Sequence, residues 1–251
     1  MRMQIFSTPC MILLMAMLVS GSAASDTYEI TRALCDAVFD YDSIAEVRNL
    51  YDKARSAARR GTEGQSERNL LLARIEYLRG RAAQNRREPK NAERFLVSAL
   101  QCVDSSIAIA PSSHAYRLKA EIVGQLSEAY LRQGKLISVV RAYREVKRLA
   151  RKALRLNPRS GKALIVLGWA ELVRPAPQRR NIRAAMRLFE KALRMPDLER
   201  DNRYSIFLGM GVAHNKLKNS SAARSWFDKA LEVYPDNKFA ASKYAETRGV
   251  E

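Results

Sequence analysis

Apolar residues recur at intervals of three and four along almost the whole chain from Thr27 onward, and this spacing places them on one side of an α-helix. Gly, Pro and polar clusters divide the pattern into segments. The predicted helices cover residues 27–40, 44–61, 67–86, 90–109, 113–132, 136–156, 160–173, 180–195, 202–217, 220–234 and 237–247. No stretch of useful length alternates apolar and polar residues as a strand does. The pattern therefore predicts an all-α protein of about ten to eleven helices.

Local signals mark several helix ends. Ser43 with Glu46 is a capping-box arrangement, and Ser113 is a candidate N-cap. The two clearest breaks, at residues 61–66 and 174–177, are rich in Gly or Pro and are predicted to be surface loops.

One phrase, Lys-Ala-Leu followed closely by proline, occurs three times in the second half of the chain. The copies are KALRLNP at 152–158, KALRMP at 191–196 and KALEVYP at 229–235. Their prolines, Pro158, Pro196 and Pro235, are separated by 38 and then 39 residues. Recurrence at this period indicates stacked helix pairs instead of one globular core.

The residues around each phrase resemble the tetratricopeptide repeat, whose pattern is Trp-x2-Leu-Gly-x2-Tyr, then Ala-x3-Phe and then Pro. The clearest match comprises Phe207, Met210, Gly211, His214, Ala223, Phe227, Ala230 and Pro235. The preceding match comprises Leu164, Leu167, Gly168, Glu171, Ala185, Phe189, Ala192 and Pro196. An earlier one comprises Val123, Leu126, Ser127, Tyr130, Val139, Tyr143 and Val146. Ser127, Glu171 and His214 depart from the pattern, so the resemblance rests on three units in succession.

This resemblance implies a right-handed superhelical solenoid of antiparallel helix hairpins. Small residues would let paired helices approach, and Phe189 and Phe227 would fill the space to the next helix. The chain would then divide into a signal peptide at 1–24, N-terminal helical hairpins of degenerate repeats at 25–111, and a repeat array with a C-terminal capping helix at 112–251.

The first 24 residues predict export. Arg2 precedes an apolar run at residues 10–19, and small residues follow it. The run is shorter than the about 20 residues that span a bilayer, and the order of charged, apolar and small residues matches a secretory signal. We expect cleavage after Ala23 or Ala24 and a location in the periplasm or cell envelope. The alternative is that the segment is kept as an anchor.

Positive charge dominates the chain, with a formal net charge of +18. Nucleic acid is the usual partner of such a chain, but an exported protein does not meet it. A protein or peptide, an anionic lipid surface or an acidic envelope polymer is therefore the expected partner. Two predicted helices carry most of the charge at helical spacing, as a stripe of Arg141, Arg144, Arg148, Arg151, Arg155, Arg183 and Arg187. This stripe is either a solvated face or a site for an anionic partner.

In tetratricopeptide arrays the first helix of each hairpin lines the concave surface, where the family binds peptides or ligands. By this resemblance the groove of the present chain would be lined by Ile165, Trp169, Leu172, Leu208, Val212 and Asn215. The alternative is that a neighbouring helix covers this apolar strip as ordinary core. Glu121 and Glu128 lie seven residues apart on one predicted helix and are expected to belong to a solvated face.

The sequence contains no recognisable catalytic chemistry. Its two histidines, His114 and His214, lack neighbours at metal-ligand spacing, and no cofactor motif occurs. Cys35 and Cys102 lie on separate predicted helices, which favours free thiols over a disulfide. We therefore expect a non-enzymatic, cofactor-free adaptor or scaffold for protein interactions at the envelope. Alternatives are a ligand-binding component that accompanies a solute transporter and holds an apolar molecule in its groove, and a scaffold docked on anionic lipid.

Overall fold

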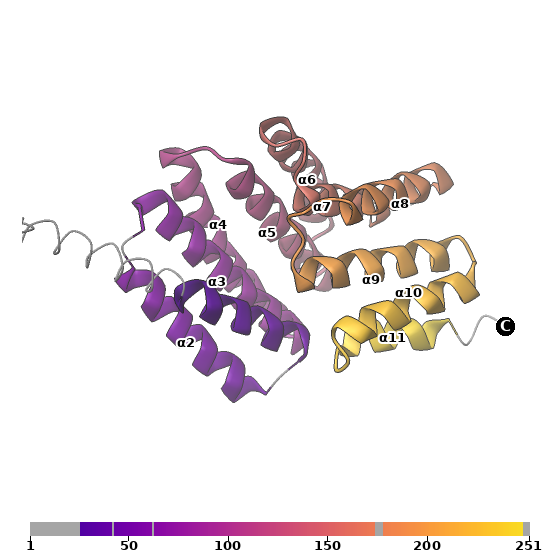
Figure 1. The fold of residues 1–251 in the computed structure, drawn as a ribbon, viewed down its shortest axis with the longest axis horizontal. Coiled ribbons are helices and arrows are strands. Elements are labelled where there is room, and N and C mark those ends of the chain that lie inside the picture. Colours follow the sequence, from indigo (N-terminus) through magenta and orange to yellow (C-terminus); the bar gives the residue numbers. More distant parts are fainter. Residues whose placement is uncertain (1–25, 42, 62, 174–177, 248–251) are drawn as a thin grey trace, which may run out of the picture.

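The computed structural model describes residues 26–41, 43–61, 63–173 and 178–247. These residues form eleven helices and no strand (Figure 1). A first helical segment covers residues 26–39. It is followed by α2 (Ile44–Arg60), α3 (Gln65–Asn85), α4 (Pro89–Ile109), α5 (Ser113–Arg132), α6 (Leu136–Leu156), α7 (Gly161–Leu172), α8 (Arg179–Leu193), α9 (Arg200–Lys216), α10 (Ser220–Val233) and α11 (Lys238–Glu246). The predicted all-α fold is confirmed.

Consecutive helices pair into hairpins that stack on one another. The closest pairs are α3 with α4, α5 with α6, α7 with α8, and α9 with α10. Neighbouring hairpins meet through α4 and α5, α6 and α7, and α8 and α9, and α11 packs against α10 at the end of the row. The molecule is therefore a solenoid of helix hairpins, as the repeat pattern predicted.

Side-chain caps define the starts of several helices. Ser43 accepts a hydrogen bond from the backbone N–H of Glu46 at 3.2 Å, as predicted. For α5 the cap is Ser112, which accepts from the N–H of Ala115 at 3.1 Å, so the choice of Ser113 was wrong by one residue. Ser113 instead donates to the carbonyl of Ala153 at 2.9 Å and thereby ties α5 to α6.

Two fully buried phenylalanines join neighbouring helices, and glycines make room for them. Phe189 of α8 packs against Gly168 of α7 and Gly209 of α9, where an added Cβ would lie 2.6 Å from its ring in each case. Phe227 packs in the same way against Gly211. Burial of these rings removes a large apolar surface from water, which is the main force that stacks the hairpins.

Contacts between the two ends of the array were not predicted. The Phe39 ring centroid lies 5.4 Å from that of Tyr204 and 5.3 Å from that of Tyr234. Asn237 donates to the carbonyl of Phe39 at 2.6 Å, and the hydroxyl of Tyr234 donates to Asp36 at 2.7 Å. In Figure 1 the indigo helix accordingly runs toward α10 and α11. The first helical segment thus packs on the last hairpin, whereas repeats of a simple solenoid contact only their neighbours.

The predicted signal peptide at 1–24 and the predicted loop at 174–177 lie outside the described residues. In the part of the chain that the structure describes, no helix is both long and apolar enough to cross a membrane.

Candidate functional site: a polar cavity on the inner surface

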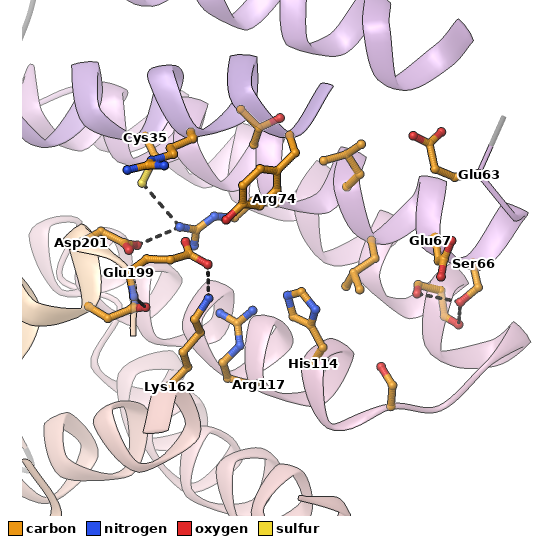
Figure 2. Close-up of a pocket in the computed structure, with 18 of the residues that line it drawn as sticks. Cys35, Glu63, Ser66, Glu67, Arg74, His114, Arg117, Lys162, Glu199 and Asp201 are labelled. Carbon is orange, nitrogen blue, oxygen red and sulfur yellow. Dashed lines mark hydrogen bonds and ion pairs between the residues drawn. The ribbon is translucent and has the colours of Figure 1, made fainter. Parts of the chain in front are cut away.

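A cavity of about 890 Å³ lies between the first helical segment and the starts of α3, α5, α7 and α9 (Figure 2). Its polar lining includes Arg32, Asp36, Glu63, Ser66, Glu67, Arg74, His114, Arg117, Lys162, Glu199, Arg200 and Asp201. Its apolar lining includes Tyr28, Leu70, Leu71, Ile109 and Tyr234. The walls therefore combine many charged side chains with a substantial apolar surface.

The stacking of hairpins explains why these residues meet. First helices of successive hairpins run in the same direction, so their N-terminal ends gather at one side of the array. Ser112 and Ser160 cap α5 and α7, and Glu199 forms a capping box with Asn202 at the start of α9. Asp197 also accepts from the N–H of Gly161 at 2.9 Å. The starts of α5, α7 and α9 at the cavity are thus capped by side chains of the protein.

Arg74 lies at the centre of the largest ionic network in the cavity wall. Its guanidinium lies 2.8 Å from Asp201 and 3.5 Å from Glu121, and donates to the sulfur of Cys35 at 3.5 Å. Arg117, whose side chain is also buried, forms an ion pair with Glu121 at 2.8 Å. Burial by itself would raise the pKa of Asp201, but the adjacent Arg74 outweighs it and holds that pKa below its usual value. Asp201 is therefore ionised at neutral pH and offsets the charge of Arg74.

Two other groups face the cavity beside this network. Lys162 forms an ion pair with Glu199 across the α7–α9 boundary. His114 points into the space between Arg117 and the wall that carries Glu67 (Figure 2). Its crowded position and the positive charges of Arg117, Lys162 and Arg74 lower the pKa of His114 below its usual value. The neutral imidazole can both donate and accept a hydrogen bond.

One wall of the cavity carries the thiol of Cys35. Burial raises the pKa of the Cys35 thiol far above its usual value, so the sulfur stays protonated and unreactive. Cys35 and Cys102 are both free. In the described ranges of the chain, no cluster of three or more His, Cys, Asp or Glu side chains could hold a metal ion.

The apolar strip predicted as a groove lies elsewhere. Ile165, Leu172 and Leu208 are buried, whereas Trp169, Val212 and Asn215 are partly buried. Trp169 packs edge-on against Phe189 at 6.0 Å between ring centroids and donates to Ser205 at 2.8 Å. None of the six residues lines the cavity described above. The strip is thus partly buried by helix packing, and its binding role stays a prediction.

Sequence reasoning missed most of the residues that line the cavity and the ionic network in its wall. Glu121 was expected on a solvated face but is largely buried between Arg74 and Arg117, so that expectation was wrong. Arg74 and Asp201 lie 127 residues apart, and no local pattern indicates that they pair. The sequence did contain one indication of the cavity. In a stacked array the first helix of each hairpin runs in the same direction, so the N-terminal ends of these helices converge on one side.

The predicted basic stripe is exposed at every position. Arg141, Arg144, Arg148, Arg151 and Arg155 lie on the outer face of α6, and Arg183 and Arg187 lie on α8. Neither helix contributes a residue to the lining of the cavity described above. Binding of an anionic partner by this stripe stays a prediction.

Comparison with known proteins agrees with this architecture. Residues 204–237 match the sequence model of the tetratricopeptide repeat family, and this segment contains every residue of the clearest repeat found by pattern. The fold is similar to the crystal structure of TTC0263, a thermophilic TPR protein in Thermus thermophilus, with a TM-score of 0.53, 16% identity, and coverage of 80% of this chain and 91% of that one. Residues 204–237 therefore form a tetratricopeptide repeat, and the fold of the chain is similar to that of a TPR protein.

Two further solved structures are more distant. YrrB, described as a TPR protein with an unusual peptide-binding site, has a TM-score of 0.35 and 15% identity and covers 77% of this chain and 83% of its own. NprR in complex with its cognate peptide NprX has a TM-score of 0.37 and 12% identity and covers 97% of this chain and 79% of its own. No curated protein matches the sequence.

Proposed function

We propose that this protein is a non-enzymatic adaptor of the cell envelope, exported by its N-terminal signal, that holds a peptide segment of a protein partner in the polar cavity. One observation carries the proposal: the first helices of successive hairpins surround a cavity of about 890 Å³ with charged and hydrogen-bonding side chains. Pockets of about 300–1,000 Å³ commonly bind ligands in proteins, and a peptide backbone offers donors and acceptors along its whole length.

The charged groups of the lining favour a peptide, which carries both polar and apolar groups, over the purely apolar ligand of the transporter alternative. An apolar molecule in this cavity would displace water from Lys162, Arg117 and Glu67 without replacing its hydrogen bonds, which is costly. A peptide segment supplies carbonyl groups to the cations and N–H groups to the carboxylates. Three of the six residues of the strip that would suit an apolar ligand, Ile165, Leu172 and Leu208, are already buried by helix packing.

Selection from a phage-displayed random peptide library would test this proposal directly. His114→Trp places a large ring in the cavity without removing an ion pair or a hydrogen bond of the described residues. The matched control is Val97→Trp on α4, because Val97 is 38% exposed and does not line this cavity. We expect selected peptides to bind the native chain and the control equally and to lose at least about tenfold in affinity for His114→Trp. Equal binding by all three proteins would contradict the proposal.

The partner in the cell can be identified with a photocrosslinking amino acid at the same two positions. A crosslinker at position 114 is expected to capture one envelope protein that position 97 does not capture. Peptides derived from that protein should then compete with the selected peptides. Fractionation of the same cells tests export, and native mass spectrometry of the purified chain tests the apolar alternative, which requires a co-purified small molecule.

A further inference from the structure

The outer face of α6 combines exposed apolar side chains with arginines. At its N-terminal end Leu136 is 63% exposed, Ile137 is 71% exposed and Val140 is 42% exposed. Leu131, at the end of the preceding helix, is 57% exposed. Large apolar side chains scattered singly on a surface are ordinary, but four within ten residues at one hairpin tip form a patch.

Arginines continue the same face toward the C-terminal end of the helix. Arg141, Arg144, Arg148, Arg151 and Arg155 are all exposed and follow one another at intervals of three or four. Residues at this spacing lie above one another on a helix, so the arginines extend the row that begins with Ile137 and Val140. The face is thus apolar at one end and cationic along the rest.

Few carboxylates neutralise this face. Arg148 pairs with Glu145 at 2.6 Å. Within the described part of the chain, Arg141, Arg144, Arg151 and Arg155 form no ion pair and donate no hydrogen bond. Arginines that served only to solubilise the surface would normally be interspersed with acids. The positive charge is therefore available to an external anion.

We propose that this face of α6 docks the protein on the surface of an anionic lipid bilayer. A bilayer interface provides both features that the face requires, since phosphate headgroups attract arginine and the acyl boundary accepts the exposed leucine, isoleucine and valine. A second copy of the chain would bring arginines against arginines, which repel each other. A hydrophilic polyanion would leave the apolar end in water.

Docking through α6 is compatible with a free cavity. The helix is the second of its hairpin, and none of its residues lines the cavity described above. Arg183 and Arg187 add exposed charge on α8. This helix, like α6, packs against α7. A protein attached through its outer helices would keep its inner surface open to a partner.

Sedimentation of the full chain with vesicles tests the proposal. One set of vesicles is pure phosphatidylcholine, and the other contains about one quarter phosphatidylglycerol. The variant Arg144→Glu/Arg151→Glu/Arg155→Glu reverses charge on α6. The control Arg48→Glu/Lys53→Glu/Arg59→Glu makes the same charge change at exposed positions of α2. Circular dichroism confirms that both remain helical.

We expect the native chain and the α2 control to bind the anionic vesicles at least about tenfold more tightly than the α6 variant does, with weaker binding at high salt. Equal loss in the two variants would show that diffuse charge, not α6, is responsible. Equal binding of the native chain to both kinds of vesicle would also overturn the proposal.

The apolar end distinguishes a bilayer from an acidic polymer or protein. Leu136→Ser/Ile137→Ser should weaken binding to anionic vesicles about fivefold or more but leave binding to soluble polyglutamate unchanged. If the double serine variant binds vesicles as well as the native chain, the face is only an anion-binding surface and the partner is an acidic macromolecule.

Discussion

One guanidinium, that of Arg74, contacts three other helices in the centre of the molecule. It reaches Cys35 on the first helical segment, Glu121 on α5 and Asp201 on α9. A buried charge is tolerated only when opposite charges and hydrogen bonds replace the water that it has lost. Each member of this network therefore depends on the others, and loss of one leaves a buried charge without its partner.

This dependence predicts how stability changes with pH. The pKa of Asp201 is lower in the folded protein than its ordinary value of 3.8, so its ionised form stabilises the fold above that pH, and this stability is lost as pH falls through the folded-state pKa. Asp201→Asn should lower the free energy of unfolding at pH 7 by about 3 kcal/mol. It should also reduce the loss of stability between pH 6 and about pH 2.5.

Urea denaturation at several pH values measures both effects. The control is Asp228→Asn, since Asp228 is exposed on α10 and has no ion pair among the described residues. A native-like pH dependence in Asp201→Asn would show that Arg74 does not stabilise the ionised carboxylate.

Packing within and between hairpins depends on a match of glycine to phenylalanine. Phe189 fits against Gly168 and Gly209, and Phe227 fits against Gly211. Protein interiors are packed about as densely as organic crystals, so a ring of this size has a place only where the facing residue lacks a side chain. Helical glycine is otherwise unfavourable by about 1 kcal/mol relative to alanine, so its presence here reflects the close approach of helices.

Two glycine substitutions should accordingly have opposite effects. Gly211→Ala introduces a Cβ that overlaps the Phe227 ring, and we expect the free energy of unfolding to fall by about 1–3 kcal/mol. Gly124→Ala, in the middle of α5, meets only Val146 at 3.9 Å and should stabilise the protein by up to about 1 kcal/mol. Chemical denaturation of the two variants measures the difference; a stabilising Gly211→Ala would contradict the proposed packing.

As a whole the molecule is an array whose ends are joined. The first helical segment packs on α9, α10 and α11 through Phe39, Tyr204, Tyr234 and Asn237. Arg200 adds ion pairs to Asp36 at 3.4 Å and to Asp40 at 3.6 Å. This contact completes the wall of the cavity, because Tyr28, Arg32 and Asp36 belong to the same segment. Binding in the cavity and closure of the array should therefore depend on each other.

Phe39→Ala tests the closure. Removal of a buried aromatic ring costs about 3–5 kcal/mol, and here the cost falls on the contact between the two ends. We expect faster amide hydrogen exchange in residues 27–39 and 238–246, unchanged exchange in α5 and α6, and a larger radius of gyration by X-ray scattering. Phe95→Ala removes a ring from α4 and serves as the control. Similar exchange profiles in the two variants would argue against a distinct closing contact.

The spacing of apolar and charged residues in the sequence was sufficient to predict much of this architecture. The bounds of α5 and α6 agree with the predicted residues 113–132 and 136–156, and the other helices differ by a few positions at their ends. Helix formation, capping and hairpin pairing depend on residues close in sequence, and an interval of three or four is enough to place Arg144, Arg148 and Arg151 on one exposed face. For the same reason Phe227 and Gly211 could be assigned a packing role from the repeat alone.

The cavity and the closure were decided only by the tertiary structure. Arg74 and Asp201 lie 127 residues apart, and Tyr234 and Asp36 lie 198 apart, so their contacts depend on the curvature summed over all the hairpins between them. The stacking of the hairpins also buries Glu121, which would be solvent-exposed if its helix stood alone. Periodicity shows which side of a helix faces inward, but only the stacked helices together determine whether that side meets another helix, an ion pair or an open cavity.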